Sequence, residues 1–387
     1  MNTPSFSTPA DYLIHLLDCA INNKQPAEKP KPFSFEKIFH FAQTHSVANI
    51  AFYSIEKLVN KPENPLYCQW QETVKQALVR NTLQRYEFDK IIKALTSNKI
   101  KVIPLKGYWL QPMYPQIDYR TMSDLDILIK PADTPKAHST IIANGYNHME
   151  DSDFHIQYCK KPYFLLEVHT SLMIEESGKA FCDYYKSIWH KTKPTDPSPY
   201  CYNLNIDEYY IYMLVHLHRH YVLGGTGIRS IMDIYIFLKS QGNSINREYI
   251  NSTLDTLGIL NFALTAEQLS LVWFNSGEST KQTAEMALYI LSSGTYGSYT
   301  NLIHNSIRAA AKTDTNNTFI LKIKYILSRL FPKLNYMKRS YTVLEKTPVL
   351  LPVLWVYRLF KTIFTSKKRV INEYKTADKI IKQKRPD

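Results

Sequence analysis

The chain has 387 residues, of which 44% are apolar and 21% are charged, an ordinary balance for a globular protein with room for two or three domains. Its 28 Tyr and 17 Phe supply bulk for a core, whereas only 11 Gly argue against a loop-rich all-β architecture. The formal net charge of +13 arises in residues 321–387, which hold 17 Lys or Arg against 4 Asp or Glu. The rest of the chain is neutral, so its charge does not indicate a nucleic-acid-binding protein.

The cysteines and the N-terminus indicate the compartment. Five cysteines, odd in number and without a CxxC motif, predict neither a disulfide framework nor a zinc site, and a reducing cytoplasm fits best. The N-terminus lacks the basic segment and cleavage site of a signal peptide, so no secretion is expected. The longest apolar stretch, residues 348–357, is about half of the roughly 20 residues that cross a bilayer, so no transmembrane span is expected.

Helices are the first predicted elements. The residues Thr8-Pro9-Ala10-Asp11 have the form of a helix start, and apolar residues then follow at helical spacing. The last of these helices is long and covers about residues 66–98. We therefore predict an N-terminal helical region at residues 1–98.

The pattern changes at Lys101 to alternating strands and helices. Three short apolar runs predict strands at residues 101–107, 123–130 and 163–170. A helical turn at 108–113 separates the first two strands, and a helix at 135–144 separates the second from the third. This order predicts a small α/β unit at residues 99–200. A turn-rich linker is expected at residues 194–199.

Helices resume from Ile206 to about residue 308 and again at 319–364, which predicts a C-terminal helical region at residues 201–365 and a basic tail at 366–387. Such a tail is usually a solvated end. Together with the amphipathic run at 355–364 it leaves open a weak peripheral contact with an anionic membrane. It lacks interleaved aromatic residues, so no specific nucleic-acid partner is expected.

Two acids in the second predicted strand indicate chemistry. Residues i and i+2 of a strand share a face, so Asp124 and Asp126 converge while Leu125, Ile127 and Ile129 face a core. Two carboxylates in a poorly solvated place repel each other unless a cation lies between them, and Mg²⁺ or Mn²⁺ suits such oxygens. The alternative is a merely solvated pair at a strand end.

A third acid lies in the third predicted strand. Glu167 is surrounded by apolar residues, where an unpaired carboxylate is costly, so a metal partner is the favoured interpretation. His169 shares its face and either orients Glu167 or simply packs.

These motifs together resemble a family of uncharacterised bacterial nucleotidyltransferases, often found beside polysaccharide genes, within the DNA polymerase β-like superfamily. The resemblance covers much of residues 35–365 and rests on the following segments: Ile103-Pro-Leu-Lys-Gly107, Arg120-x-x-Ser-Asp-x-Asp126, Leu166-Glu-Val-His169, His216-x-x-x-His220 and Gly227-Ile-Arg229-x-x-x-Asp233. It implies an α+β fold with a polymerase β-type core, a small mixed sheet with helices, flanked by helical regions on both sides.

The resemblance also implies roles for the acids. Asp124 and Asp126 would ligate two metal ions, and Glu167 would ligate one and act as base for the acceptor hydroxyl. The turn at Gly107 would let the backbone approach the nucleotide phosphates.

The turn departs from the superfamily pattern, because Lys106-Gly107-Tyr108 stands where Gly-Ser is common and the hydroxyl that touches phosphate is missing. Lys106 and Arg120 would supply the phosphate contact by charge, or else they are surface cations. Ser123 either binds phosphate or caps the strand.

The later motifs lie on predicted helices. His216 and His220 share a helix face but lack the Glu of HExxH, so they either pack or contact the substrate. Arg229 and Asp233 are four residues apart and are expected to form a structural ion pair, with a site role for Arg229 as the alternative.

The predicted function is metal-dependent transfer of a nucleoside monophosphate from a nucleoside triphosphate such as ATP to a hydroxyl of a sugar, small molecule or protein, with release of pyrophosphate. The alternative is a catalytically inactive nucleotide- or carbohydrate-binding module of the same fold. The three acids favour the enzyme, whereas the missing turn serine favours the module.

Overall fold

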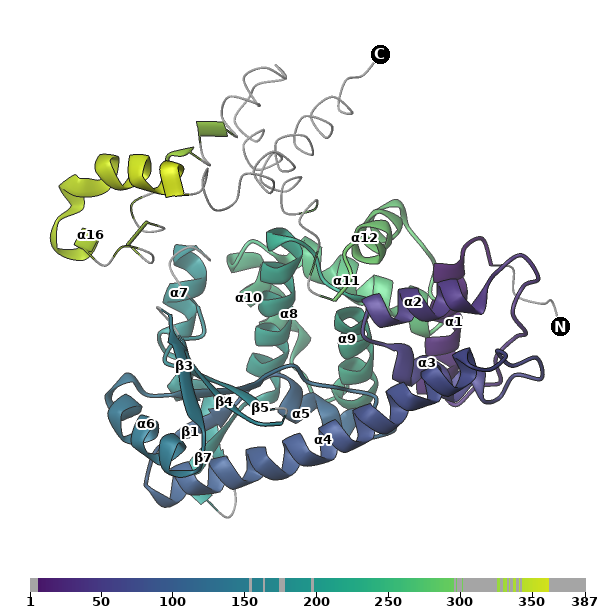
Figure 1. Cartoon of the computed structure of the whole chain (residues 1–387), viewed down its shortest axis with the longest axis horizontal. Coiled ribbons are helices and arrows are strands. Elements are labelled where there is room, and N and C mark those ends of the chain that lie inside the picture. The colour runs from purple at the N-terminus through teal and green to yellow at the C-terminus, as the bar shows by residue number, and fades with distance from the viewer. Residues whose placement is uncertain are drawn as a thin grey trace. The chain divides into compact units, whose positions relative to one another are not determined.

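The computed structural model describes residues 6–152, 155–162, 164–173, 178–195 and 198–295, with shorter stretches between residues 297 and 361 (Figure 1). The chain divides into two compact units. The first unit consists of Met1–Arg219 and Thr226–Thr295, and the second of His220–Gly225 and Tyr296–Asp387. The predicted division into four regions stays a prediction, and the basic tail at 366–387 lies outside the described residues.

The first unit begins with helices, as the apolar spacing predicts: α1 (Pro9–Ile21), α2 (Phe35–Thr44), α3 (Ala48–Ile55) and α4 (Leu66–Ser97). The predicted helix start is confirmed, because the Asp11 N–H donates to the Thr8 hydroxyl at 3.2 Å and the Thr8 N–H donates to the Asp11 carboxylate at 2.9 Å. The buried indole of Trp70 on α4 donates to the Ala48 carbonyl at 2.7 Å, which fixes α4 against α3.

The described residues then form a seven-stranded mixed sheet with the strand order β3-β4-β5-β2-β1-β7-β6. Its strands are β1 (Val102–Pro104), β2 (Leu125–Ile129), β3 (Asn147–Asp151), β4 (His155–Lys160), β5 (Phe164–His169), β6 (Thr192–Thr195) and β7 (Ser198–Leu204). Strand β2 is parallel to β5 and β1 is parallel to β7, whereas the other neighbours are antiparallel. The predicted strands correspond to β1, β2 and β5, so the expected alternation of strands and helices is confirmed.

The expected linker at residues 194–199 is wrong, because this segment contributes to β6 and β7. Pro194 lacks the N–H that a central strand needs, but β6 pairs only with β7 at the edge of the sheet, where proline is tolerated. Strand β7 in turn pairs with β1, so the sheet continues past residue 200, where the predicted core ends. The hairpin of β3 and β4 is a further addition that the residue pattern does not predict.

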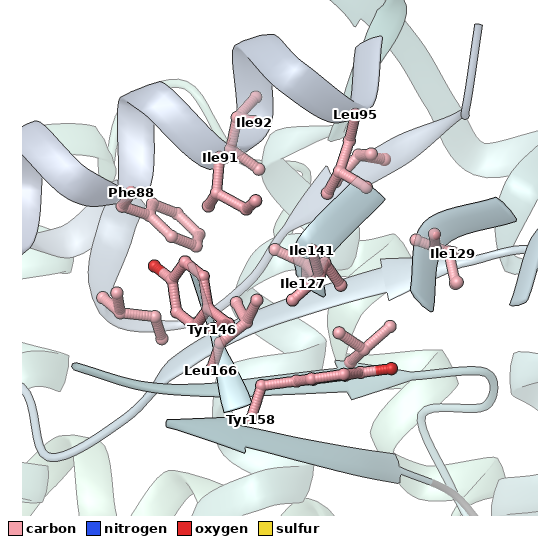
Figure 2. Close-up of a cluster of buried hydrophobic side chains, with 14 of the residues drawn as sticks. Phe88, Ile91, Ile92, Leu95, Ile127, Ile129, Ile141, Tyr146, Tyr158 and Leu166 are labelled. Carbon is pink, nitrogen blue, oxygen red and sulfur yellow. The ribbon is translucent and has the colours of Figure 1, made fainter. Parts of the chain in front are cut away.

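The hydrophobic core of the sheet lies against α4 (Figure 2). Phe88, Ile91 and Leu95 of the helix face Ile127 and Ile129 of β2, and all five side chains are buried. The predicted core face of β2 is therefore confirmed. Each such side chain contributes about 1.5–3 kcal/mol when fully buried, so this layer fixes β2 and leaves Asp126 on the other face of the strand.

Helices complete the first unit. Between the strands and after them lie α5 (Gly107–Leu110), α6 (Thr134–Ala143), α7 (Lys179–Tyr185), α8 (Ile206–Leu223), α9 (Ile228–Gln241), α10 (Arg247–Thr256), α11 (Leu260–Phe274) and α12 (Lys281–Leu291), with short 3-10 turns at Gln111–Met113, Pro131–Asp133 and Ile188–Lys191. The last residues of α8, from His220 on, belong to the second unit. The predicted return to helices at Ile206 is confirmed. Asn22 beside α1 donates to the Phe274 carbonyl at 2.9 Å, so the two ends of the unit are joined.

The second unit contains α16 (Val343–Lys346), a 3-10 turn at Pro348–Leu350 and a helical segment at 351–361. The indole of Trp355 in this segment donates to the Pro332 carbonyl at 3.0 Å. No helix within the described residues has both the length and the apolar character needed to cross a membrane. The predicted peripheral contact of the C-terminus with a membrane stays a prediction.

Candidate active site

Two acidic side chains lie next to each other on neighbouring strands. In the parallel pairing of β2 with β5, Asp126 lies opposite Glu167. Their neighbours along the two strands, Ile127 and Val168, are buried in the core cluster, so the acids point to the other face of the sheet. Asp124 lies just before the first residue of β2.

Asp126 is almost fully buried, and two basic side chains contact it. Lys106 Nζ donates to Asp126 Oδ1 at 3.0 Å, and His169 Nε2 lies 2.7 Å from the same oxygen. Burial alone would raise the pKa of Asp126, but the charge of Lys106 and the hydrogen bond with His169 outweigh burial and hold this pKa well below its usual range. Burial would likewise lower the pKa of Lys106, but the charge of Asp126 reverses the shift and raises it. Asp126 therefore carries its charge beside a lysine that also stays charged.

The other two acids experience the opposite shift. Burial first, and then the charge of Asp126, raise the pKa of both Asp124 and Glu167 above the usual range. Their hydrogen bonds do not offset this effect: Ser123 Oγ donates to Asp124 Oδ1 at 3.4 Å and Gln157 Nε2 donates to Glu167 Oε1 at 2.9 Å. A divalent cation would relieve the repulsion among these carboxylates.

One group of three potential metal ligands is present in the part of the chain that the structure describes, and it consists of Asp126, Glu167 and His169. Their ligand atoms lie within 4.8 Å of one another, and His169 Nε2 is 3.6 Å from Glu167 Oε2. Two carboxylates and an imidazole fit a divalent ion. His169, predicted to orient Glu167 or to pack, thus lies among the potential ligands, whereas Asp124 does not belong to this group.

The turn from β1 to α5 has an unusual backbone. Lys106 has a φ of 44° and a ψ of −115°, a conformation that costs a residue with a side chain about 1–3 kcal/mol. Tyr209 on α8 holds this turn, because its hydroxyl donates to the Lys106 carbonyl at 2.6 Å. At Gly107 an added Cβ would lie 2.4 Å from Arg120 Nη1 and 2.8 Å from Met122 Sδ. A side chain at this position would therefore displace Arg120 or Met122, so the packing of the turn favours glycine. The predicted approach of Gly107 to a phosphate stays a prediction.

A buried ion pair joins the segment before β2 to α9. Arg120 Nε donates to Asp233 Oδ1 and Arg120 Nη2 donates to Asp233 Oδ2, both at 2.9 Å, while the Tyr114 hydroxyl donates to Oδ1 at 2.6 Å. Helical spacing predicted Arg229 as the partner of Asp233, but the bidentate partner is Arg120, which lies 113 positions away in the sequence. Arg229 Nη1 instead donates to the Thr121 carbonyl at 2.8 Å. The predicted phosphate contact of Arg120 stays a prediction, and its guanidinium is buried in this structure.

The two predicted histidines lie one turn apart on α8. His216 is half-buried and His220 is exposed. Neither belongs to a group of three potential ligands within the described residues. Their predicted contact with the substrate stays a prediction.

Two further residues of α8 interact electrostatically with the site, and the sequence motifs do not include them. Burial raises the pKa of the Tyr212 hydroxyl, and the charge of Lys106 acts against this shift. The charge of Arg219 acts on both Tyr212 and His155. Tyr212 does not stand out in the sequence, because the chain has 28 tyrosines and one at helical spacing is usually a packing residue. The sequence does contain a signal that could have identified them, because at helical spacing Tyr212 and Arg219 lie on the same face of α8 as His216.

The sequence of this chain matches one family model, described as uncharacterised nucleotidyltransferase, over residues 31–275. No curated protein matches the chain. The solved structure of the antibiotic-resistance factor ANT(2'')-Ia is similar with a TM-score of 0.35 and 11% sequence identity, and the match covers 48% of this chain and 96% of that chain.

Proposed function

Because the chain belongs to the uncharacterised nucleotidyltransferase family and is therefore a transferase, we propose that it moves a nucleoside monophosphate from a nucleoside triphosphate to a hydroxyl and releases pyrophosphate. The observation that carries this proposal is the pairing of Asp126 with Glu167 across two parallel strands, with Asp124 just before the first of them. We assign the polymerase β-type core to β1, β2 and β5 with α5 and α6.

In the proposed reaction, the acceptor oxygen bonds to the α-phosphorus while the bond from this phosphorus to the pyrophosphate oxygen breaks. Glu167 takes the proton of the acceptor hydroxyl. Its carboxylate lies on the same face of the sheet as Asp126, where it can accept this proton. Lys106, whose ammonium lies at Asp126, neutralises charge on the phosphates.

The donor set on β2 and β5 would hold the divalent ion. Asp126 and Glu167 would be its carboxylate ligands, with Asp124 close by, and the bound ion would offset the negative charge of the triphosphate. The proposed acceptor is a hydroxyl of a sugar, a small metabolite or a protein side chain. The proposed compartment is the cytoplasm, which suits a chain with five cysteines and no CxxC motif.

The test is release of pyrophosphate from ATP, GTP, CTP and UTP with Mg²⁺ or Mn²⁺ and a panel of hydroxyl acceptors. Asp126→Asn should abolish release, and Glu167→Gln should lower the rate by about 10²–10⁴-fold, the contribution of a general base. Asp151→Asn removes an exposed acid of the edge strand β3 and is the matched control that should retain the rate. Nucleotide binding without any metal-dependent pyrophosphate release, across the whole panel, would instead support the inactive binding module.

A further inference from the structure

A histidine lies between the two paired carboxylates. His169 follows Glu167 by two positions on β5, so both side chains point to the same face of the sheet as Asp126. Its Nε2 atom is 2.7 Å from Asp126 Oδ1 and 3.6 Å from Glu167 Oε2, and its side chain is 8% exposed. One nitrogen therefore faces an oxygen of each acid in a place that water hardly reaches.

These spacings resemble those around a bound metal ion. An octahedral ion with ligands at about 2.1 Å separates adjacent ligand atoms by about 3.0 Å. The two nitrogen–oxygen distances, 2.7 Å and 3.6 Å, lie on either side of that value. A cation is already attracted to this point, since the ammonium of Lys106 lies 3.0 Å from Asp126 Oδ1. Small side-chain shifts would thus bring all three ligand atoms onto one ion.

The chemistry of the donors decides which ion is preferred. Mg²⁺ favours oxygen ligands and gains little from an imidazole nitrogen, whereas first-row transition ions bind nitrogen more tightly. Two carboxylates without a thiolate suit Mn²⁺ among those ions. Building on the proposed function, we propose that His169 ligates the divalent ion directly, together with Asp126 and Glu167, and that this site binds Mn²⁺ in preference to Mg²⁺.

The rival explanation is that His169 only orients Asp126 by a hydrogen bond. The two roles differ in their effect on selectivity. Loss of a nitrogen ligand weakens Mn²⁺ binding more than Mg²⁺ binding, because the lost bond matters more to the transition ion. Loss of an orienting hydrogen bond weakens both ions alike, since both need the same carboxylate.

Pulsed electron paramagnetic resonance of Mn²⁺ bound to the full chain, without nucleotide, tests ligation directly. We expect a ¹⁴N coupling that changes to a ¹⁵N coupling when the protein is labelled with ¹⁵N-histidine, which shows that a histidine binds the ion. The coupling should vanish in His169→Gln and persist in His148→Gln, a control on the edge strand β3. Absence of Mn²⁺ binding, or bound Mn²⁺ without nitrogen coupling, overturns the proposal.

Titrations with each ion test selectivity. We expect His169→Gln to weaken Mn²⁺ binding by at least about tenfold, because even groups that only support a ligand contribute that much to metal affinity. The dissociation constant for Mg²⁺ divided by that for Mn²⁺ should therefore be lower in the variant than in the wild type. An unchanged ratio overturns the preference. Neither measurement involves nucleotide: nitrogen coupling without pyrophosphate release refutes the proposed reaction alone, and pyrophosphate release without nitrogen coupling refutes the ligation alone.

Discussion

Removal of Asp233 should destabilise the first unit far more than removal of an exposed acid. The side chains of Arg120 and Asp233 are each 10% exposed, and Asp233 also accepts a hydrogen bond from the Tyr114 hydroxyl. In Asp233→Ala the guanidinium would stay buried without its carboxylate, and such losses cost about 3–5 kcal/mol. This is a large part of the roughly 5–15 kcal/mol by which native proteins are stable.

Urea unfolding followed by tryptophan fluorescence measures the loss, with Asp183→Ala as the matched control. Asp183 pairs with Lys186 on the surface, where their side chains are 45% and 74% exposed, so this substitution should leave the urea midpoint unchanged. The double variant Arg120→Met/Asp233→Leu should recover most of the stability, because it leaves neither partner charged. An Asp233→Ala midpoint equal to that of Asp183→Ala would refute the reasoning.

Three further outcomes are expected. Gly107→Ala should lower stability by about 1–3 kcal/mol in urea unfolding, because the new Cβ would lie 2.4 Å from a buried guanidinium nitrogen; a variant as stable as wild type contradicts this. Tyr209→Phe should lower the free energy of unfolding by about 1 kcal/mol, because it removes the hydrogen bond from the Tyr209 hydroxyl to the Lys106 carbonyl. An unchanged melting temperature would argue against that bond. Burial lowers the pKa of His45, whose Nδ1 accepts the Ile228 N–H at 3.3 Å, so its contribution to stability is present above about pH 6.5 and is lost as the pH falls below it. His45→Gln should therefore flatten the fall in stability below about pH 6.5, measured by urea unfolding, and an equally steep fall would exclude this histidine as the cause.

The helices and the acid-bearing strands could be predicted because their signals are local. A capping box marks the start of α1, and alternation along β2 separates Asp126 from Ile127. The chain order of strand and helix then gives the α/β unit. These features depend on residues a few positions apart, which is the range over which a single sequence is informative.

The partners of the site residues could not be predicted in the same way. Asp233 and Arg120 lie 113 positions apart, and only the fold brings α9 to the segment before β2. Glu167 could be identified as the third acid, but its alignment with Asp126 depends on the register of two strands that are distant in sequence. Strand β6 carries a proline and short polar residues, so its pattern resembles a turn, and only its position at the edge permits the strand.

The two edge strands of the sheet have a consequence for solubility. An edge strand offers unpaired N–H and carbonyl groups to other chains, and long apolar edges lead to aggregation. All five residues of β3 are exposed, and Glu150 and Asp151 place charge along it. At the opposite end, β6 is only four residues long and combines Lys193 with Pro194. Charge on one edge strand, and short length with a proline on the other, are therefore features that oppose strand addition by a second copy.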